Sequence, residues 1–337
     1  MVLEGCRVKF DTCDVELGPP AMERWPMNSP GQLPSYSVLA PAKINLWLRV
    51  LGRRTDGFHE LETRMAPLDL CDRLTLTVVA SLPVGTIDFS CDDLSVPCGD
   101  SNLVVKAVRA LEVSIGPLPG MRLHLEKRIP HGAGLGGGSS DAAAALRLVR
   151  EVFCQDVNDE IVQTAAAAVG SDVPFFLLGG VADALGRGER VVPVGEFTER
   201  SRVLLVKLPL GIATPWAYQR WKDSREVTGL PYAPQETEIG ELSNDLERPV
   251  FEKYQVLGHL KAALQAMSGV KAALMSGSGS TLFALLEEGA DLAPIAAVIA
   301  EEAGGEVRLI DTRVVPGLRP ISCPGDRFPL AATDVAL

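Results

Sequence analysis

The stretch IPHGAGLGGGSSDAAAAL, residues 129–146, constrains the chain more than any other feature. It contains five glycines and two serines directly before a run of residues that favours a helix. Because glycine weakens regular structure, this concentration indicates either an undemanding loop or a backbone that must come very close to a bound group. The surrounding sequence helps to decide between these two interpretations.

The segment GAGLGG, residues 132–137, fits the GxGxxG pattern of dinucleotide-binding proteins. That fold requires a nearly all-apolar parallel strand before the loop and a strand–helix–strand unit around it. Here the preceding segment, MRLHLEK, alternates polar and apolar residues, and the helix after the loop leads to another helix. The loop also lacks a GKS or GKT ending. The pattern therefore argues against a nicotinamide, flavin or Walker-type site.

A phosphate-binding loop explains this composition better than an ordinary glycine-rich connection does. A helix N-terminus offers free N–H groups and the positive end of the helix dipole, and glycines let phosphate oxygens approach closely. Ser139 and Ser140 add hydroxyls for a phosphate or a metal ion. Lys127, Arg128 and His131 supply local positive charge to a chain whose net charge is −11.

The length of 337 residues predicts two domains. The patterning favours a mixed sheet with helices in the first half and a small αβ sandwich in the second. Strands are expected at 42–52, 72–79, 121–127 and 202–210, with a strand–turn–strand unit at 270–288. Helices are expected at 102–114, at 139–153 with a serine cap, at 158–170 with a left-handed end at Gly170, at 249–267 and at 292–303.

Composition excludes several classes of partner. The acidic balance argues against nucleic acid and anionic membranes. No apolar run approaches the roughly 20 residues of a membrane-spanning helix. Seven scattered cysteines without a CxxC pair are typical of free thiols in the cytoplasm. The first residues, to about 34, are expected to form a loose extension, and the tail from about 315 to be irregular.

Three motifs in a fixed order resemble the GHMP kinase superfamily. They are PAKINLWL near the start, PHGAGLGGGSS in the middle and LMSGSGSTLFAL near the end. The resemblance implies an α+β fold with the two-domain GHMP kinase architecture, a mixed-sheet N-terminal domain and a smaller αβ sandwich C-terminal domain. The implied divisions are an extension at 1–36, the ATP-binding domain at 37–197, the C-terminal domain at 198–314 and a tail at 315–337.

Further stretches narrow the resemblance. APAKINLWLRVLGRRTDGFHELET, GSDVPFF and SNDLE are similar to superfamily members that phosphorylate the 2-hydroxyl of 4-diphosphocytidyl-2-C-methyl-D-erythritol, in the non-mevalonate route to isoprenoids. The implied cofactors are ATP and Mg²⁺. The implied partners are this small CDP-linked substrate and ATP, with neither nucleic acid nor membrane, for a cytoplasmic monomer or homodimer.

Two segments carry the implied catalytic pair. Lys43 and Asn45 share one face of a strand, which from the pattern alone would be a solvated outer face. Asp172 of GSDVPFF would by itself be a cap for a helix that starts near Val173. The resemblance instead implies that Lys43 polarises the attacking hydroxyl, that Asn45 touches substrate and that Asp172 takes the proton.

The resemblance also implies a site for the cytosine ring. Phe58 would stack on the ring and His59 would bond to its polar edge, whereas the plainer interpretations are core packing for Phe58 and a turn position for His59. Tyr218 of ATPWAY would supply the second aromatic face, and Trp216 is the competing candidate. Two aromatic faces and one polar reader suffice to recognise a pyrimidine.

The remaining implied contacts are with ATP and the second glycine loop. SGSGST could be a plain hairpin turn, but the resemblance places Gly277, Ser278 and Gly279 over the bound groups. With no dense carboxylate cluster, Mg²⁺ is expected to arrive with ATP and to contact Ser140. The implied ATP-binding residues are Asn102, Lys127, Pro130, His131, Gly132, Ala133, Gly134, Leu135, Gly136, Gly137, Gly138, Ser139 and Ser140.

Two rival functions stay open at this level. One is another small-molecule kinase of the superfamily, of the homoserine or mevalonate type, which would gain if Phe58, His59 and Tyr218 did not converge on one pocket. The other is a non-catalytic nucleotide-binding sensor on the same fold. The presence of Lys43 and Asp172 argues against the sensor.

Overall fold

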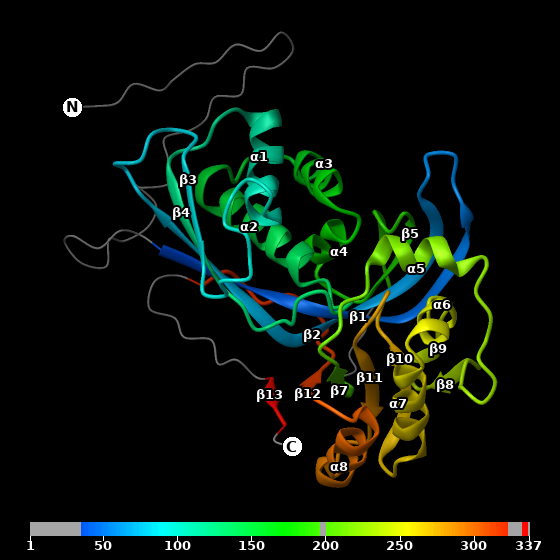
Figure 1. The fold of residues 1–337 in the computed structure, drawn as a ribbon. Coiled ribbons are helices and arrows are strands. Elements are labelled where there is room, and N and C mark those ends of the chain that lie inside the picture. Colours follow the sequence, from blue (N-terminus) through cyan, green and yellow to red (C-terminus); the bar gives the residue numbers. More distant parts are fainter. Residues whose placement is uncertain (1–34, 196–199, 323–331, 336–337) are drawn as a thin grey trace, which may run out of the picture.

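The computed structural model describes residues 35–195, 200–322 and 332–335, which form two β-sheets with helices packed on them (Figure 1). The expected N-terminal extension lies outside the described residues up to position 34, and the predicted boundary at 197 also falls outside them. None of the described helices is long and apolar enough to cross a membrane.

The first sheet has eight strands and is mixed. Its main order is β3-β4-β2-β1-β9-β8, and β5 pairs with both β2 and β6. The β3–β4 and β1–β9 pairs are parallel, and the others are antiparallel. The strands are β1 Ser35–Arg53, β2 His59–Val78, β3 Ile87–Cys91, β4 Met121–Glu126, β5 Ala182–Gly186, β6 Arg190–Pro193, β8 Gln235–Thr237 and β9 Gly240–Asn244.

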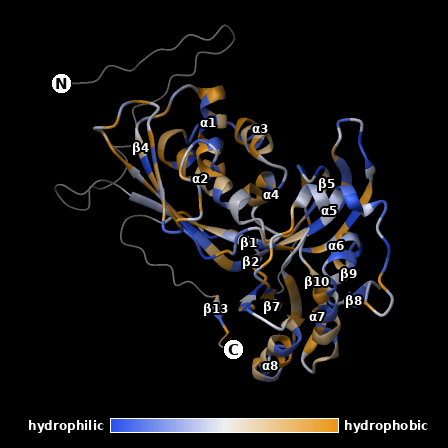
Figure 2. Cartoon of the chain, viewed as in Figure 1, coloured by the Kyte–Doolittle hydropathy of each residue, from blue (hydrophilic) through white to orange (hydrophobic). Residues whose placement is uncertain are grey.

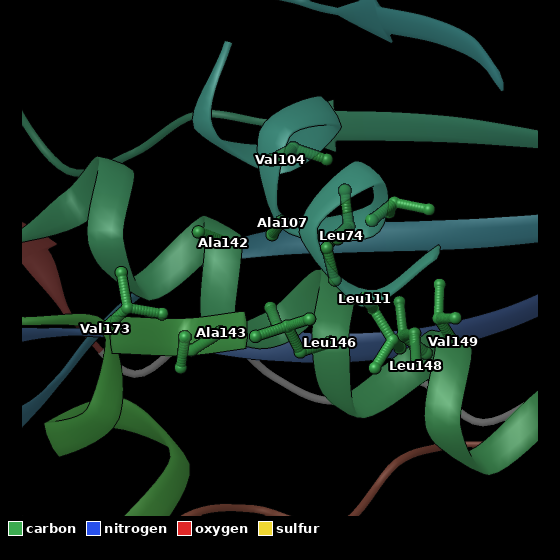
Figure 3. Close-up of a cluster of buried hydrophobic side chains, with 14 of the residues drawn as sticks. Leu74, Val104, Ala107, Leu111, Ala142, Ala143, Leu146, Leu148, Val149 and Val173 are labelled. Carbon is green, nitrogen blue, oxygen red and sulfur yellow. The ribbon is translucent and has the colours of Figure 1, made fainter. Parts of the chain in front are cut away.

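Four helices form a layer beside this sheet (Figure 1). They are α1 Leu103–Ile115, α2 Gly137–Phe153, α3 Asp159–Val169 and α4 Val173–Leu178. Helix α2 packs against the other three helices and against both β1 and β2. Its run Ala142–Ala145 is fully buried, and small side chains allow this close approach. Leu74, Leu111 and Leu146 lie in the resulting core, which Figure 3 shows.

Two predicted helix ends are wrong. Helix α2 begins at Gly137, and the residue before it is Gly136, whose φ is 72° and which offers no side-chain cap, so the expected serine cap is absent. Ser139 and Ser140 instead lie within the first turn. Gly170 has φ of 179°, an extended conformation rather than the left-handed end expected, because the chain continues directly toward α4.

The second sheet has five strands in the order β10-β11-β7-β12-β13, all antiparallel. The strands are β7 Arg202–Lys207, β10 Val270–Met275, β11 Leu282–Leu286, β12 Arg308–Arg313 and β13 Thr333–Asp334. Figure 2 shows that β10 and β11 are rich in apolar residues, as expected for strands under helices. The tail, which was expected to be irregular, contributes one short strand, because β13 pairs with β12 in antiparallel orientation.

The second half also contains four helices, α5 Thr214–Trp221, α6 Glu247–Lys253, α7 Gln255–Ala266 and α8 Leu292–Ala303. Helix α7 packs on β10 and β11, and α8 packs beside α7. The single helix predicted at 249–267 is divided at Tyr254, whose φ of −120° and ψ of 68° are not helical.

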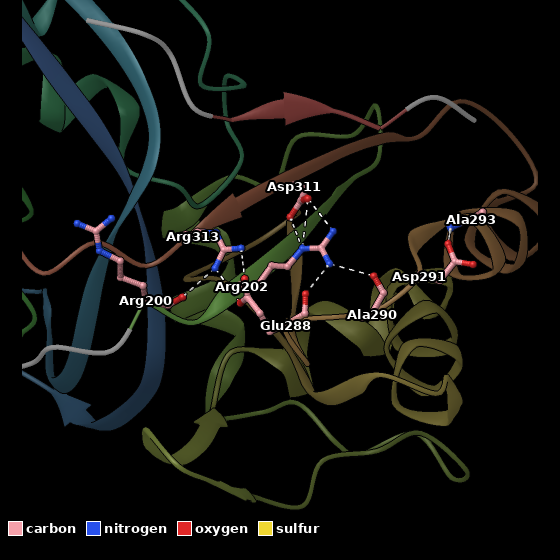
Figure 4. A network of polar contacts seen from close by, with 8 residues as sticks. All are labelled: Arg200, Arg202, Glu288, Ala290, Asp291, Ala293, Asp311 and Arg313. Carbon is pink, nitrogen blue, oxygen red and sulfur yellow. Dashed lines mark hydrogen bonds and ion pairs between the residues drawn. The ribbon is translucent and has the colours of Figure 1, made fainter.

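A polar network connects β7 and β12, two inner strands of the second sheet, to the turn between β11 and α8 (Figure 4). The guanidinium of Arg202 on β7 donates to the carboxylate of Asp311 on β12 and to the carbonyl of Ala290. Arg313 pairs with Glu288 in the turn after β11. These contacts join two strands to the start of α8.

The two halves of the chain are interleaved. Strand β9, which comes from the second half, pairs in parallel with β1 at Trp47 and Leu48. Strands β8 and β9 thereby extend the first sheet, and β9 also contacts β10 of the second sheet. One strand therefore connects the two sheets next to the middle of β1.

Candidate active site

A cavity of about 580 Å³ lies where the two halves meet. Its walls come from β1, the β1–β2 hairpin, the first glycine loop, the turn before α4, the β5–β6 turn, α5 and the second glycine loop. Segments that are far apart in the sequence therefore line one open cavity.

The Nζ of Lys43 lies 3.7 Å from Oδ2 of Asp172 in this cavity. Lys43 is buried, whereas the carboxylate of Asp172 is 37% exposed and faces the open space. Asp172 occupies the position before α4, but its side chain makes no capping hydrogen bond. The carboxylate is therefore available to a ligand, and the interpretation of Asp172 as a helix cap loses its support.

Hydrogen bonds hold Lys43 in place. Its Nζ donates to Oδ1 of Asn45 at 2.5 Å, and Nδ2 of Asn45 donates to Oγ1 of Thr63 at 2.8 Å. The Thr63 hydroxyl in turn donates to the carbonyl of Trp47 at 2.6 Å. Lys43 and Asn45 are both buried rather than on a solvated face, and both line the cavity.

Burial lowers the pKa of Lys43 below its ordinary value, and the charge and hydrogen bonding of Asp172 oppose that effect. A buried amine loses hydration of its charged form, while a nearby carboxylate favours the charged form. The protonation of Lys43 therefore depends directly on Asp172.

The first glycine loop requires glycine where it meets the second. Gly132, Gly134 and Gly136 all have left-handed φ values, of 57°, 75° and 72°. A side-chain carbon on Gly134 would lie 2.2 Å from the backbone oxygen of Ser276, which is too close for any atom. The Ser276 hydroxyl donates to the carbonyl of Gly134 at 3.0 Å. The two loops therefore pack backbone to backbone.

The start of α2 faces the same cavity. Its first intrahelical bond runs from the N–H of Ser140 to the carbonyl of Gly136 at 2.9 Å. The N–H groups of residues 137–139 precede that bond, and all three residues line the cavity. This arrangement has the geometry of an anion-binding helix end.

The second glycine loop is only partly in the cavity. Gly277 and Ser278 line it, but Gly279 does not: a side-chain carbon on Gly279 would lie 2.7 Å from Sδ of Met275, inside the protein. Asn244 on β9 supports the loop, because its Nδ2 donates to the carbonyls of Met275 at 2.6 Å and Gly277 at 2.8 Å. SGSGST is therefore a supported wall of the cavity rather than a plain hairpin turn.

Two of the predicted ATP-binding residues do not line the cavity. The amide of Asn102 caps α1 by accepting from the N–H of Val104 at 2.8 Å, and it donates to the carbonyl of Pro97 at 2.8 Å. Ser140 is buried, and its Oγ has no hydrogen-bond partner among the described residues. The other predicted ATP-binding residues, from Lys127 and from the loop at 130–139, do line the cavity.

Lys127 is held by two buried carboxylates. Its Nζ donates to Asp141 at 2.8 Å and also to Asp72, and Oδ1 of Asp72 accepts the N–H groups of Arg128 and Ile129. Burial and the neighbouring Asp72 raise the pKa of Asp141, although Lys127 opposes the shift. This cluster fixes the backbone that leads into the first glycine loop.

The three residues expected at the cytosine ring converge. Phe58, His59 and Tyr218 all line the cavity, and the rings of His59 and Tyr218 stack with centroids 5.4 Å apart. Trp216 instead packs edge-on against Tyr254, outside the cavity. Burial lowers the pKa of His59, helped by Arg53, which favours a neutral ring that can both donate and accept.

Several lining residues carried no recognisable signal in the sequence. Arg187 lies in a Gly-Arg-Gly turn that reads only as a connection between strands. Thr63 reads as one more alternating strand residue. The lining residues that the sequence reasoning missed include Thr63, Ser171, Arg187, Gly188, Thr214, Pro215 and Gln219.

Family models match both halves of the chain. The GHMP kinases N terminal domain matches residues 102–180 and the GHMP kinases C terminal domain matches residues 233–304. Solved structures of a homoserine kinase from Cytophaga hutchinsonii (TM-score 0.55, 15% identity, 89% of this chain and 99% of that one) and of a mevalonate kinase (TM-score 0.57, 13% identity, 82% and 98%) share the fold. The fold is that of a GHMP kinase, which confirms the predicted α+β two-domain architecture.

Relatives with higher sequence identity show which kind of GHMP kinase this chain resembles. The 4-diphosphocytidyl-2-C-methyl-D-erythritol kinase of Methylacidiphilum infernorum is 43% identical over 74% of this chain and 85% of its own length. That of Synechococcus sp. strain CC9902 is 40% identical over 77% and 92%. A crystal structure of 4-(cytidine 5'-diphospho)-2C-methyl-D-erythritol kinase superposes with a TM-score of 0.65, at 36% identity over 83% of this chain and 99% of that one. The chain belongs to this family of kinases.

Proposed function

We propose that the protein transfers the γ-phosphoryl group of ATP to the 2-hydroxyl of 4-diphosphocytidyl-2-C-methyl-D-erythritol. The observation that carries the proposal is a single cavity lined by the Lys43–Asp172 pair, the first glycine loop and the three residues Phe58, His59 and Tyr218. Family membership supports a kinase that uses ATP. The cavity contains groups suited to the phosphates, the acceptor hydroxyl and the cytosine ring.

The Lys43–Asp172 pair would act on the acceptor. The 2-hydroxyl lies between the two side chains, and Asp172 accepts its proton as the oxygen bonds to the γ-phosphorus. The bond from that phosphorus to the β,γ-bridging oxygen breaks, and ADP leaves. Lys43 offsets the negative charge at the reacting oxygen. Phosphoryl transfer depends on alignment and charge stabilisation, which these two groups and the loop N–H groups supply.

Mg²⁺ belongs to the proposal through Ser140. No cluster of three or more histidine, cysteine or carboxylate side chains that could hold a metal occurs in the described part of the chain. Ser140 is buried but follows Ser139, which lines the cavity, and its Oγ is a hard oxygen donor with no partner among the described residues, which fits Mg²⁺ carried by ATP. The ion would neutralise phosphate charge when bound, and Ser140 would be its contact.

The convergence of Phe58, His59 and Tyr218 favours a cytidine nucleotide over homoserine or mevalonate, because neither of those acceptors has a ring to stack. The non-catalytic sensor is not favoured, since the relatives are kinases and Lys43 and Asp172 meet. The free thiols support a cytoplasmic enzyme. We also propose that the protein is a monomer or a homodimer and that it has no nucleic-acid or membrane partner. Light scattering of the purified protein would distinguish a monomer from a homodimer.

The test is an assay of the purified chain with ATP, Mg²⁺ and the cytidine substrate, followed by ³¹P NMR of the product. A new phosphomonoester signal and equimolar ADP are expected. Homoserine and mevalonate serve as matched acceptors and should give no product. Phosphorylation of either acceptor in place of the cytidine substrate would overturn the assignment.

A further inference from the structure

The turn between β5 and β6 directs one arginine into the cavity. Gly186 and Gly188 have left-handed φ values of 77° and 106°, so the chain reverses tightly around Arg187. The N–H of Arg187 donates to Oε2 of Glu189 at 2.7 Å, and that of Gly188 donates to the carbonyl of Leu185 at 3.1 Å. The backbone is thus fixed by local bonds, and the side chain of Arg187 lines the cavity.

This turn touches both ends of the proposed acceptor site. The guanidinium carbon of Arg187 lies 4.8 Å from the centre of the Phe58 ring. A side-chain carbon on Gly188 would lie 3.8 Å from Oδ1 of Asp172 and 3.6 Å from Cβ of Ser171. The turn therefore reaches from the Phe58 ring, which Arg187 contacts, to the catalytic carboxylate, which Gly188 approaches.

The guanidinium N–H groups of Arg187 donate no hydrogen bond to the described part of the protein. Its nearest carboxylate oxygen, Oε2 of Glu189, is 3.9 Å from Nε, which is beyond hydrogen-bond distance. The two lysine side chains that line the cavity already have partners. Lys43 contacts Asn45 and Asp172, and Lys127 pairs with the carboxylates of Asp72 and Asp141. Among the described residues that line the cavity, Arg187 is thus the arginine or lysine whose side chain donates no hydrogen bond to protein.

We infer that Arg187 binds the diphosphate of the nucleotide-linked substrate, an inference that rests on the proposed function. If the cytosine ring lies at Phe58 and the acceptor alcohol at Asp172, the ribose, the diphosphate and the C4–C3 segment of the erythritol connect them, and the diphosphate is the charged part of that connection. A guanidinium matches phosphate oxygens with paired N–H donors. Arg187 would make the site specific for a nucleoside diphosphate and not for the base alone.

A purely structural alternative is that Arg187 only supports the Phe58 ring through a cation–π contact. Losing that support would weaken cytidine and CDP to the same extent. Losing a phosphate contact would weaken CDP and leave cytidine unchanged. The ratio of the two affinities therefore separates the alternatives.

The experiment measures binding of cytidine and of CDP by calorimetry, with a non-hydrolysable ATP analogue present to fill the ATP site. Arg187→Ala should weaken CDP by about ten- to hundredfold, the range of a charge-assisted hydrogen bond, and cytidine by less than about twofold. Arg187→Lys should recover part of the CDP affinity. Arg190→Ala, in the same hairpin but outside the cavity, is the control and should change neither.

In turnover assays, Arg187→Ala should raise KM for the cytidine substrate by a similar factor and leave KM for ATP unchanged. Equal weakening of cytidine and CDP, or an unchanged CDP affinity in a folded variant, would overturn the inference. A wild-type protein that binds CDP more tightly than cytidine but does not phosphorylate the substrate would refute the proposed function alone.

Discussion

Lys43 and Asp172 face each other at 3.7 Å, although one lies in the middle of the first strand and the other in the turn before α4. Helix α2 packs against β1 and α4 packs against α2, and this arrangement brings the two side chains together. The buried amine and the accessible carboxylate leave room for one hydroxyl beside them.

The first prediction concerns Asp172→Asn. Loss of a general base costs about 10²- to 10⁴-fold in rate, so kcat should fall within that range while both KM values change little. Because the side chain makes no capping bond, Tm should stay within a few degrees of the wild type. Steady-state kinetics and thermal melting check both parts. A kcat within a few-fold of the wild type would exclude the base role.

The second prediction concerns the pKa of Lys43. Burial lowers this pKa and Asp172 raises it, so removing the carboxylate charge should lower it further. In Asp172→Asn the amine should lose its proton at a lower pH than in the wild type, as followed by NMR of labelled lysine side chains. Asp88→Asn, an exposed site on β3, is the control. An upward shift in Asp172→Asn would contradict the electrostatic account.

The third prediction compares two glycines of the first loop. Gly134→Ala places a carbon 2.2 Å from the Ser276 oxygen at a left-handed φ and should destabilise the protein by about 2–5 kcal/mol. Gly132→Ala has open space around it and should cost only about 1–2 kcal/mol for its φ. Chemical denaturation measures the difference. Equal losses would show that the contact between the loops is unimportant.

The fourth prediction separates Tyr218 from Trp216. Tyr218→Ala should raise KM for the cytidine substrate about tenfold or more, since stacking on a base contributes about 1–3 kcal/mol. Tyr218→Phe keeps the stacking face and should stay near the wild type. Trp216→Ala should leave that KM unchanged, because its ring packs on Tyr254. A larger KM effect from Trp216→Ala would reverse the assignment.

The fifth prediction concerns the carboxylates around Lys127. Asp72→Asn weakens bonds to two backbone N–H groups and to Lys127, and should cost about 2–4 kcal/mol in unfolding free energy. Asp141→Asn should cost less than Asp72→Asn, because an amide oxygen can still accept from Lys127, no backbone N–H bonds to Asp141, and its Oδ1 has no partner among the described residues. Denaturant titration at neutral pH compares them, and the opposite ranking would refute this account.

The sequence predicted most elements and the two glycine loops, because periodicity and glycine placement are local signals. It could not show that Lys43 and Asn45 are buried, since a strand face that points into a ligand cavity has the same polar pattern as one that faces water. Arg187 was missed for a related reason: a Gly-Arg-Gly turn carries no periodicity. The resemblance implies that Asn102 binds ATP, but its amide caps α1 and does not line the cavity.

The pairing of β9 with β1 could not be predicted either, because short strands pair across long separations through tertiary contacts alone. That pairing brings Asn244 to the carbonyls of Met275 and Gly277. The second glycine loop thus depends on a strand that belongs to the first sheet.

This interleaving bears on how such an enzyme can evolve. A segment ending near residue 195 would carry the first glycine loop but would lack β9, the second partner of β1, and the second glycine loop opposite the first. Its nucleotide site could not pass to another protein by a simple fusion of the front half. Gene rearrangements within this lineage should therefore preserve the two halves as one inherited unit.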